Sequence, residues 1–216
     1  MRLKFISLLV MGAILVGGVE AHATMVRPFA PKELFDHAGY VFSGKVMSVR
    51  GERLDGTIVS RIVFRDLYMI KGASRSDSLT LTLEGGMADN DMIAVEGQPR
   101  FSVGQRYIVF ATRDLGAEGY HRPVLGLGQG CYSVATDGTV HSGAGWPVVG
   151  LTRGTVTVAV PNSMRPVPAG QWVPEPRSQD STLRIIPERQ TLGKRMRESE
   201  FLEVVRTFSD TSEQPR

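Results

Sequence analysis

Residues 40–70 read YVFSGKVMSVRGERLDGTIVSRIVFRDLYMI. Both halves are rich in β-branched and aromatic residues, which favours strands. Between them stands Asp55-Gly56, a pair that accepts the positive φ angles needed at both central positions of a tight hairpin turn. The stretch therefore predicts a long antiparallel hairpin. One face of its second strand is expected to be buried, because apolar residues share one parity there: Ile58, Ile62, Phe64, Tyr68 and Ile70.

Further strands are expected beyond this hairpin. Residues 78–84 read SLTLTLE, the clearest alternation of apolar and polar residues in the chain. Asp137-Gly138 predicts a second hairpin turn. Short strands separated by turns, with little helix, are typical of a small closed or partly open β-barrel of the oligonucleotide/oligosaccharide-binding (OB) type. The remaining strands are expected over residues 92–95, 106–112, 120–127, 131–135, 139–141 and 156–160.

Two helices flank the predicted strands. Residues 31–38 begin with Pro31 and are followed by Gly39, which is typical of a short helix. Residues 192–208 predict a C-terminal helix, because Phe201, Val204, Val205 and Phe208 fall on one helical face. The resulting organisation is a signal segment over 1–23, a β-barrel domain over 24–160, a proline-rich connector over 161–190, and a C-terminal helix and tail over 191–216.

The first residues are typical of a cleaved secretory signal. Arg2 and Lys4 precede an apolar run over 5–16, and Ala21-His22-Ala23 offers a small-x-small cleavage site. The run is shorter than the roughly 20 residues needed to span a bilayer. We therefore expect export to the periplasm or the extracellular space, a mature chain that begins at Thr24, and no membrane anchor in it.

Charge and cysteine content limit the classes of function that we expect for this protein. The formal net charge of +3 is too small, and the basic residues too dispersed, to favour nucleic acid as a partner. Cys131 is the only cysteine, so no internal disulfide forms. It is expected to be a small packed residue. The alternative is a thiol-dependent hydrolase in which His121 or His141, on a neighbouring strand, serves as the base.

The order of the segments resembles a family of exported bacterial proteins with a netrin-like barrel, similar to that of the tissue inhibitors of metalloproteinases. This resemblance implies an OB-like barrel. It implies no inhibitory residue, because Thr24 stands where the animal inhibitors have the cysteine that binds the protease zinc. The residues that carry the resemblance lie in 33–34, 40–46, 67–72, 79–81, 85–86, 97–104, 107–110 and 126–130.

The loop over 85–100 is the candidate binding region, because recognition in such barrels falls to loops. The alternative is that this loop merely closes one end of the barrel. If the loop does not bind a partner although the fold is intact, the region of Trp146 and Trp172 becomes the candidate. Asp89-Asn90-Asp91 resembles the start of a calcium loop, but a polar turn is favoured, since the rest of the calcium pattern is absent. The candidate binding residues are Met87, Asp89, Asp91, Met92 and Arg100.

These observations predict an exported, non-enzymatic binding module of the bacterial envelope. Its expected partner is a protein or peptide, such as a peptidase. No catalytic residue, no metal site and no cofactor are expected.

Overall fold

The computed structural model describes residues 27–74, 76–117, 119, 121–160, 182–187 and 194–210. The expected signal segment over 1–23 and Trp172 of the expected connector lie outside the described residues. The elements in chain order are α2 (Pro31–His37), β1 (Tyr40–Leu54), β2 (Thr57–Lys71), β3 (Leu79–Glu84), β4 (Gly86–Ala88), β5 (Asp91–Ile93), β6 (Arg106–Ala111), the 3-10 helix η2 (Leu127–Gly130), β7 (Cys131–Val134), β8 (Val140–His141), β9 (Val148–Leu151), β10 (Val156–Val160), β11 (Leu183–Pro187) and α3 (Glu198–Arg206).

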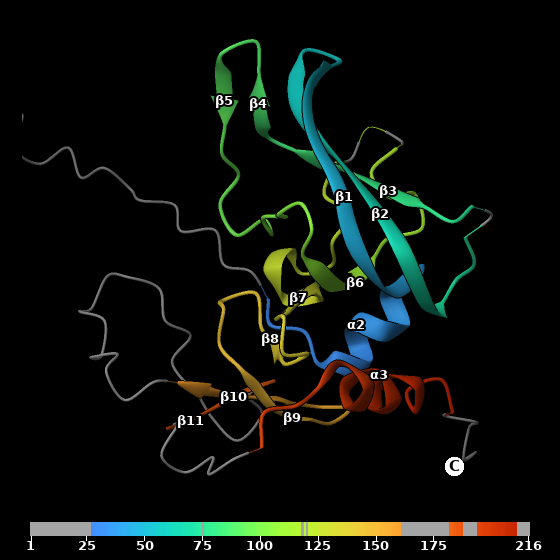
Figure 1. Ribbon diagram of the computed structural model, residues 1–216, viewed down its shortest axis with the longest axis vertical. Helices are drawn as coiled ribbons and strands as arrows, with labels where there is room; N and C mark the ends of the chain where they lie inside the picture. Colours follow the sequence, from blue (N-terminus) through green and yellow to red (C-terminus); the bar gives the residue numbers. More distant parts are fainter. Residues whose placement is uncertain are drawn as a thin grey trace, which may run out of the picture.

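The described part of the chain is mainly β, and its strands form three sheets (Figure 1). A six-stranded antiparallel sheet has the order β3-β2-β1-β6-β7-β8. A second sheet has the order β11-β10-β9, in which β10 and β11 run parallel. The hairpin β4–β5 forms the third. Among the described residues, none of the helices has the length and hydrophobicity to cross a bilayer.

The long hairpin predicted from residues 40–70 is confirmed. Leu54 pairs with Thr57, and Asp55 and Gly56 have φ angles of 47° and 81°. The parity expected for β2 holds through Phe64 and then breaks, because Asp66 adopts a φ of 51°. Tyr68 is consequently 38 % exposed instead of buried.

Replacing Gly56 by valine is expected to lower the free energy of unfolding by about 1 kcal/mol or more, because a β-branched residue resists positive φ. A Cβ at this position would meet no atom within 4 Å, so the cost comes from the backbone alone. Urea denaturation measures the change. The matched control is Gly154→Val, at an equally open position without a positive φ, where a change within about 0.5 kcal/mol is expected. Equal effects of the two variants would contradict the turn.

The expectation was a closed or partly open barrel, and the sheets do not close, because the edge strands β3 and β8 do not pair with each other. A loop covers the β3 edge instead. The N–H of Thr82 donates to the Leu115 carbonyl (2.9 Å), and the N–H of Glu84 donates to the His121 carbonyl (2.6 Å). A Cβ on Gly116 would lie 2.1 Å from the Thr82 carbonyl oxygen, so this close approach requires glycine.

The strand expected over 120–127 is also wrong. Of its described residues, only Val124 makes a β-bridge, to Ala111. Pro123 lacks an N–H for a ladder, and Gly126 turns the chain with a φ of 59° into η2. Strands β4, β9 and β11 were not expected, and β11 lies within the range assigned to the proline-rich connector.

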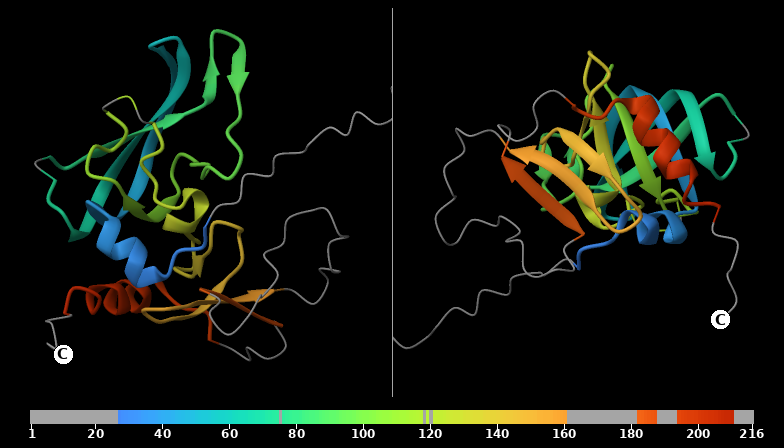
Figure 2. Two further views of the ribbon diagram at one scale, coloured as in Figure 1. Left: turned by 180° about the vertical axis from the view of Figure 1, so that it is seen from behind. Right: turned by 90° about the horizontal axis from the view of Figure 1, so that it is seen from below.

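The six-stranded sheet carries a hydrophobic core on each face. Tyr107 and Val109 of β6 point into one core, and the alternate residues Ile108 and Phe110 point into the other. The first core lies on one face of the sheet, and its larger members include Phe42, Ile62, Phe64 and Leu81. The second core is shared with α2, α3 and the β9–β11 sheet, which lie at the end of the molecule opposite to the hairpin tips (Figure 2).

Helix α3 packs on the second core through an apolar face. Phe201, Val205 and Phe208 are buried as the helical spacing predicted, but Leu202 is buried in place of Val204. The start of the helix is tied to the sheet by polar groups. The Ser43 hydroxyl donates to the Glu198 carboxylate, and Arg106 Nη1 donates to Ser43 Oγ (3.2 Å). Helix α3 begins at Glu198, later than the expected start at residue 192.

Candidate functional site: the β4–β5 hairpin

Four of the five candidate binding residues lie on one tight hairpin. Strands β4 and β5 pair through Gly86–Ile93, Met87–Met92 and Ala88–Asp91. Asp89 and Asn90 form the turn between them, with φ angles of 51° and 70°. Two successive left-handed residues are typical of a type I′ turn, whose twist matches that of the paired strands. The tip of this hairpin projects beside the tip of β1–β2 (Figure 1).

One face of the hairpin rests on β1 and β2 through close backbone contacts. A Cβ on Gly51 would lie 1.9 Å from the Met87 carbonyl oxygen, and a Cβ on Gly86 would lie 2.1 Å from Ser60 Oγ. The Ser60 hydroxyl donates to the Gly85 carbonyl (2.8 Å). Ala88, on the same face of the hairpin as Gly86, is 9 % exposed. Glycines at these two positions therefore let the hairpin lie against the long hairpin.

Arg53 on β1 holds the hairpin turn. Its Nε lies 3.3 Å from Asp89 Oδ2, and its Nη2 forms an ion pair with Asp91. All three side chains are largely exposed, so the pairs orient the turn more than they stabilise the fold. The carboxylates resembling the start of a calcium loop are thus engaged by a guanidinium. The described residues contain no group of three or more metal-ligating side chains.

The opposite face of the hairpin presents two methionines to solvent. Met87 is 66 % exposed and Met92 is 73 % exposed, and the two are direct cross-strand neighbours. Large apolar side chains that are exposed side by side are typical of a contact surface. Methionine is flexible and polarizable, so a pair of methionines adapts to differently shaped partners. We call this pair the methionine face.

Arg100, the fifth candidate, is not part of the hairpin. Its side chain is exposed, and its carbonyl accepts a hydrogen bond from the Tyr107 hydroxyl (3.4 Å). The segment leading to it rests on the body of the protein. Gln98 Nε2 donates to the Glu84 carbonyl (2.9 Å), and the N–H of Gly128 donates to the Gly97 carbonyl (2.9 Å). The first half of the loop over 85–100 projects as the β4–β5 hairpin, whereas its second half packs against the body of the protein.

Cys131 is a buried core residue. Its side chain is 3 % exposed, and burial raises the pKa of the thiol to about 12. A nucleophilic cysteine needs access and a lowered pKa. His121 Nδ1 lies 2.7 Å from the Gly116 carbonyl oxygen, and His141 pairs with Ser133 on the neighbouring strand. Neither histidine hydrogen-bonds the thiol, so this geometry gives no support to a thiol-dependent hydrolase.

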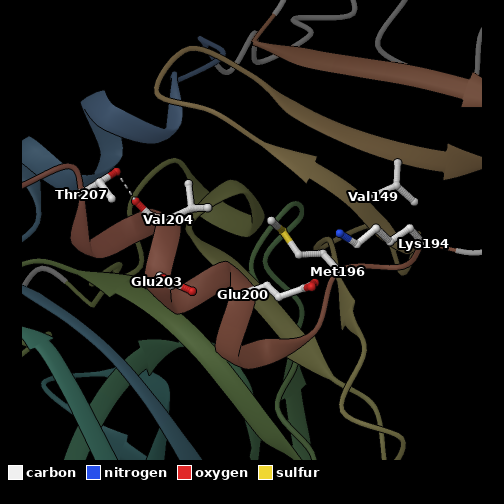
Figure 3. A pocket seen from close by; sticks show the side chains of 7 residues that line it. All are labelled: Val149, Lys194, Met196, Glu200, Glu203, Val204 and Thr207. Carbon is white, nitrogen blue, oxygen red and sulfur yellow. Dashed lines mark hydrogen bonds between the residues drawn. The ribbon is translucent and has the colours of Figure 1, made fainter.

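A hollow between β9 and α3 was not expected from the sequence. Its volume is about 420 Å³, and apolar side chains share its wall with two carboxylates (Figure 3). The only sequence signal was Val204, a partly buried residue of α3 that packs against the second core and also lines this hollow. The lining residues are Val149, Lys194, Met196, Glu200, Glu203, Val204 and Thr207.

Comparison of the chain with models of known protein families gives no match, and comparison with curated proteins gives none either.

Proposed function

We propose that the protein is an exported, non-enzymatic binding module that engages a protein or peptide partner through the methionine face of the β4–β5 hairpin. The observation that carries this proposal is the exposure of Met87 and Met92, at 66 % and 73 %, on a hairpin fixed to the body of the protein. Apolar side chains held on a fixed support bind without a large ordering cost.

The rest of the hairpin supports a macromolecular partner. The methionine face stands on a projecting tip, which suits a partner surface better than an enclosed ligand. The exposed carboxylates beside it, Asp89 and Asp91, disfavour nucleic acid. Export is supported by the signal-like residues 1–23, and an OB-like arrangement of the first strands is supported by the netrin-like resemblance.

Affinity capture from an envelope fraction tests the proposal. The double variant Met87→Ser/Met92→Ser is expected to reduce recovery of the partner about tenfold or more, corresponding to a loss of about 1.4 kcal/mol. The melting temperature is expected to stay close to that of the unmodified protein, because neither side chain is buried.

Val103→Ser is the matched control, because Val103 is 64 % exposed and lies outside the hairpin. Its recovery of partner is expected to equal that of the unmodified protein. Undiminished recovery by the double methionine variant would contradict the proposed surface. A large drop in its melting temperature would show that the methionines stabilise the fold.

A further inference from the structure

We propose that the partner supplies an extended segment that adds as a strand to the outer edge of β5. This inference rests on the proposed function and names how the partner is held. Addition of a strand gives affinity through backbone hydrogen bonds, and side-chain pockets or faces give specificity.

The hydrogen-bonding pattern of the hairpin leaves this edge open. In a two-residue hairpin the pair beside the turn, here Ala88–Asp91, exchanges both backbone hydrogen bonds, and the next pair exchanges none. The N–H and C=O of Met92 therefore point away from β4. No other backbone partner of Met92 is found among the described residues. An extended chain placed here would bond to Met92 and touch its side chain.

Two of the other sheet edges are covered. The covering loop bonds to β3 through the carbonyls of Leu115 and His121. Beside β8, the N–H of Val140 donates to the Met196 carbonyl (3.0 Å). Proteins protect exposed edges because an open edge pairs with other chains. Strand β5 is exposed along its whole length. Within the described part of the chain, no loop bonds to its outer edge as one does to β3.

The charge around β5 indicates which kind of partner segment fits this edge. Residues 86–96 carry Asp89, Asp91 and Glu96 and no basic side chain. Arg53 is shared by the two aspartates, so the edge is left with an excess of negative charge. A second copy of this chain would bring like charges together, which disfavours self-pairing. The fitting partner is an extended segment of another protein, with apolar residues at alternate positions and lysine or arginine beside them.

The variant Met92→Pro isolates the backbone contribution. Proline removes an N–H that points outward on an edge strand, where proline is tolerated. The control Met92→Leu keeps both the N–H and an apolar side chain. The probes are synthetic peptides selected from a displayed library of random dodecapeptides on the full chain. We expect selected peptides to share alternating apolar residues with basic neighbours, and to bind at least tenfold more weakly to Met92→Pro than to Met92→Leu.

The outcomes separate this inference from the proposed function. Equal binding to Met92→Pro and Met92→Leu would overturn strand addition, and loss of binding in Met87→Ser/Met92→Ser would then leave the methionine face standing as a side-chain surface. Selection of peptides that lack the alternating pattern or the basic residues, or failure to select any, would also overturn it. Self-association of the full chain that Met92→Pro abolishes would assign the edge to a second copy instead.

Discussion

Replacing Phe64 by alanine is expected to lower the free energy of unfolding by about 3–5 kcal/mol, because a fully buried aromatic side chain is lost and a cavity remains. Phe64 is 0 % exposed at the centre of the first core. Its ring contacts Phe42 and Phe101 edge to face, with centroids 5.3 Å and 5.4 Å away. Urea denaturation followed by tryptophan fluorescence and by circular dichroism measures the loss.

Val49→Ala is the matched control for this core substitution. Val49 lies opposite Ile62 in the same long hairpin but is 38 % exposed. The expected change is within about 0.5 kcal/mol. A cost below about 1 kcal/mol for Phe64→Ala would mean that the first core is not packed as described.

Alkaline pH is expected to destabilise the protein through Cys131. Burial raises the pKa of this thiol from its ordinary value of 9.0 to about 12. The neutral thiol is therefore favoured in the folded protein, and its contribution to stability is complete below pH 9 and is lost as the pH rises towards 12. At pH 11 the loss is expected to be about 2–3 kcal/mol, since each unit of pKa difference corresponds to about 1.4 kcal/mol.

Cys131→Ala separates the thiol from the other groups that titrate at high pH, among them Tyr132, whose pKa is also raised by burial. The alanine variant is expected to start less stable at pH 8 and to lose less free energy between pH 8 and pH 11. Thiol reagents are expected to react with Cys131 only after unfolding. Parallel pH dependences, or rapid modification of the native protein, would contradict the buried placement.

Local signals in the sequence predicted the first half of the sheet. Asp55-Gly56 defines a turn that few other residues can form, and the alternation over 78–84 matches β3 (Leu79–Glu84). The break in β2 was not predictable, because Asp66 is a non-glycine residue at positive φ in the middle of an apolar pattern. A long-range contact accompanies this conformation: Arg106 Nη1 donates a hydrogen bond to the Asp66 carbonyl (3.2 Å).

The six-stranded sheet does not close into a barrel because long-range contacts cover its two edges. The loop that covers β3 depends on Gly116 fitting against the Thr82 carbonyl, and nothing in the local sequence indicates that approach. Met196, whose carbonyl accepts the hydrogen bond from Val140 of β8, lies far from β8 in the sequence. Periodicity reports which face of a strand is buried, but it does not report what lies beside a sheet edge.

The sequence predicted only part of the candidate site, because the rest of the site also depends on long-range contacts. The methionines and the aspartates were identified because they lie together in one polar, glycine-flanked loop. Arg53 was missed, since it lies 36 residues from Asp89 in the sequence. Arg100 was included because of its nearness in sequence, yet the Gln98 and Gly97 contacts direct its segment back onto the body of the protein.

Hydrogen–deuterium exchange of the full chain, with and without its bound partner, tests whether the partner binds at the outer edge of β5. Binding is expected to slow exchange of backbone amides over 86–94, with the largest change at Met92, while α3 and the β9 edge keep their rates. Slowed exchange confined to the hollow lined by Val149 and Glu200, with no change over 86–94, would show that the partner binds at the hollow and not at the β4–β5 hairpin.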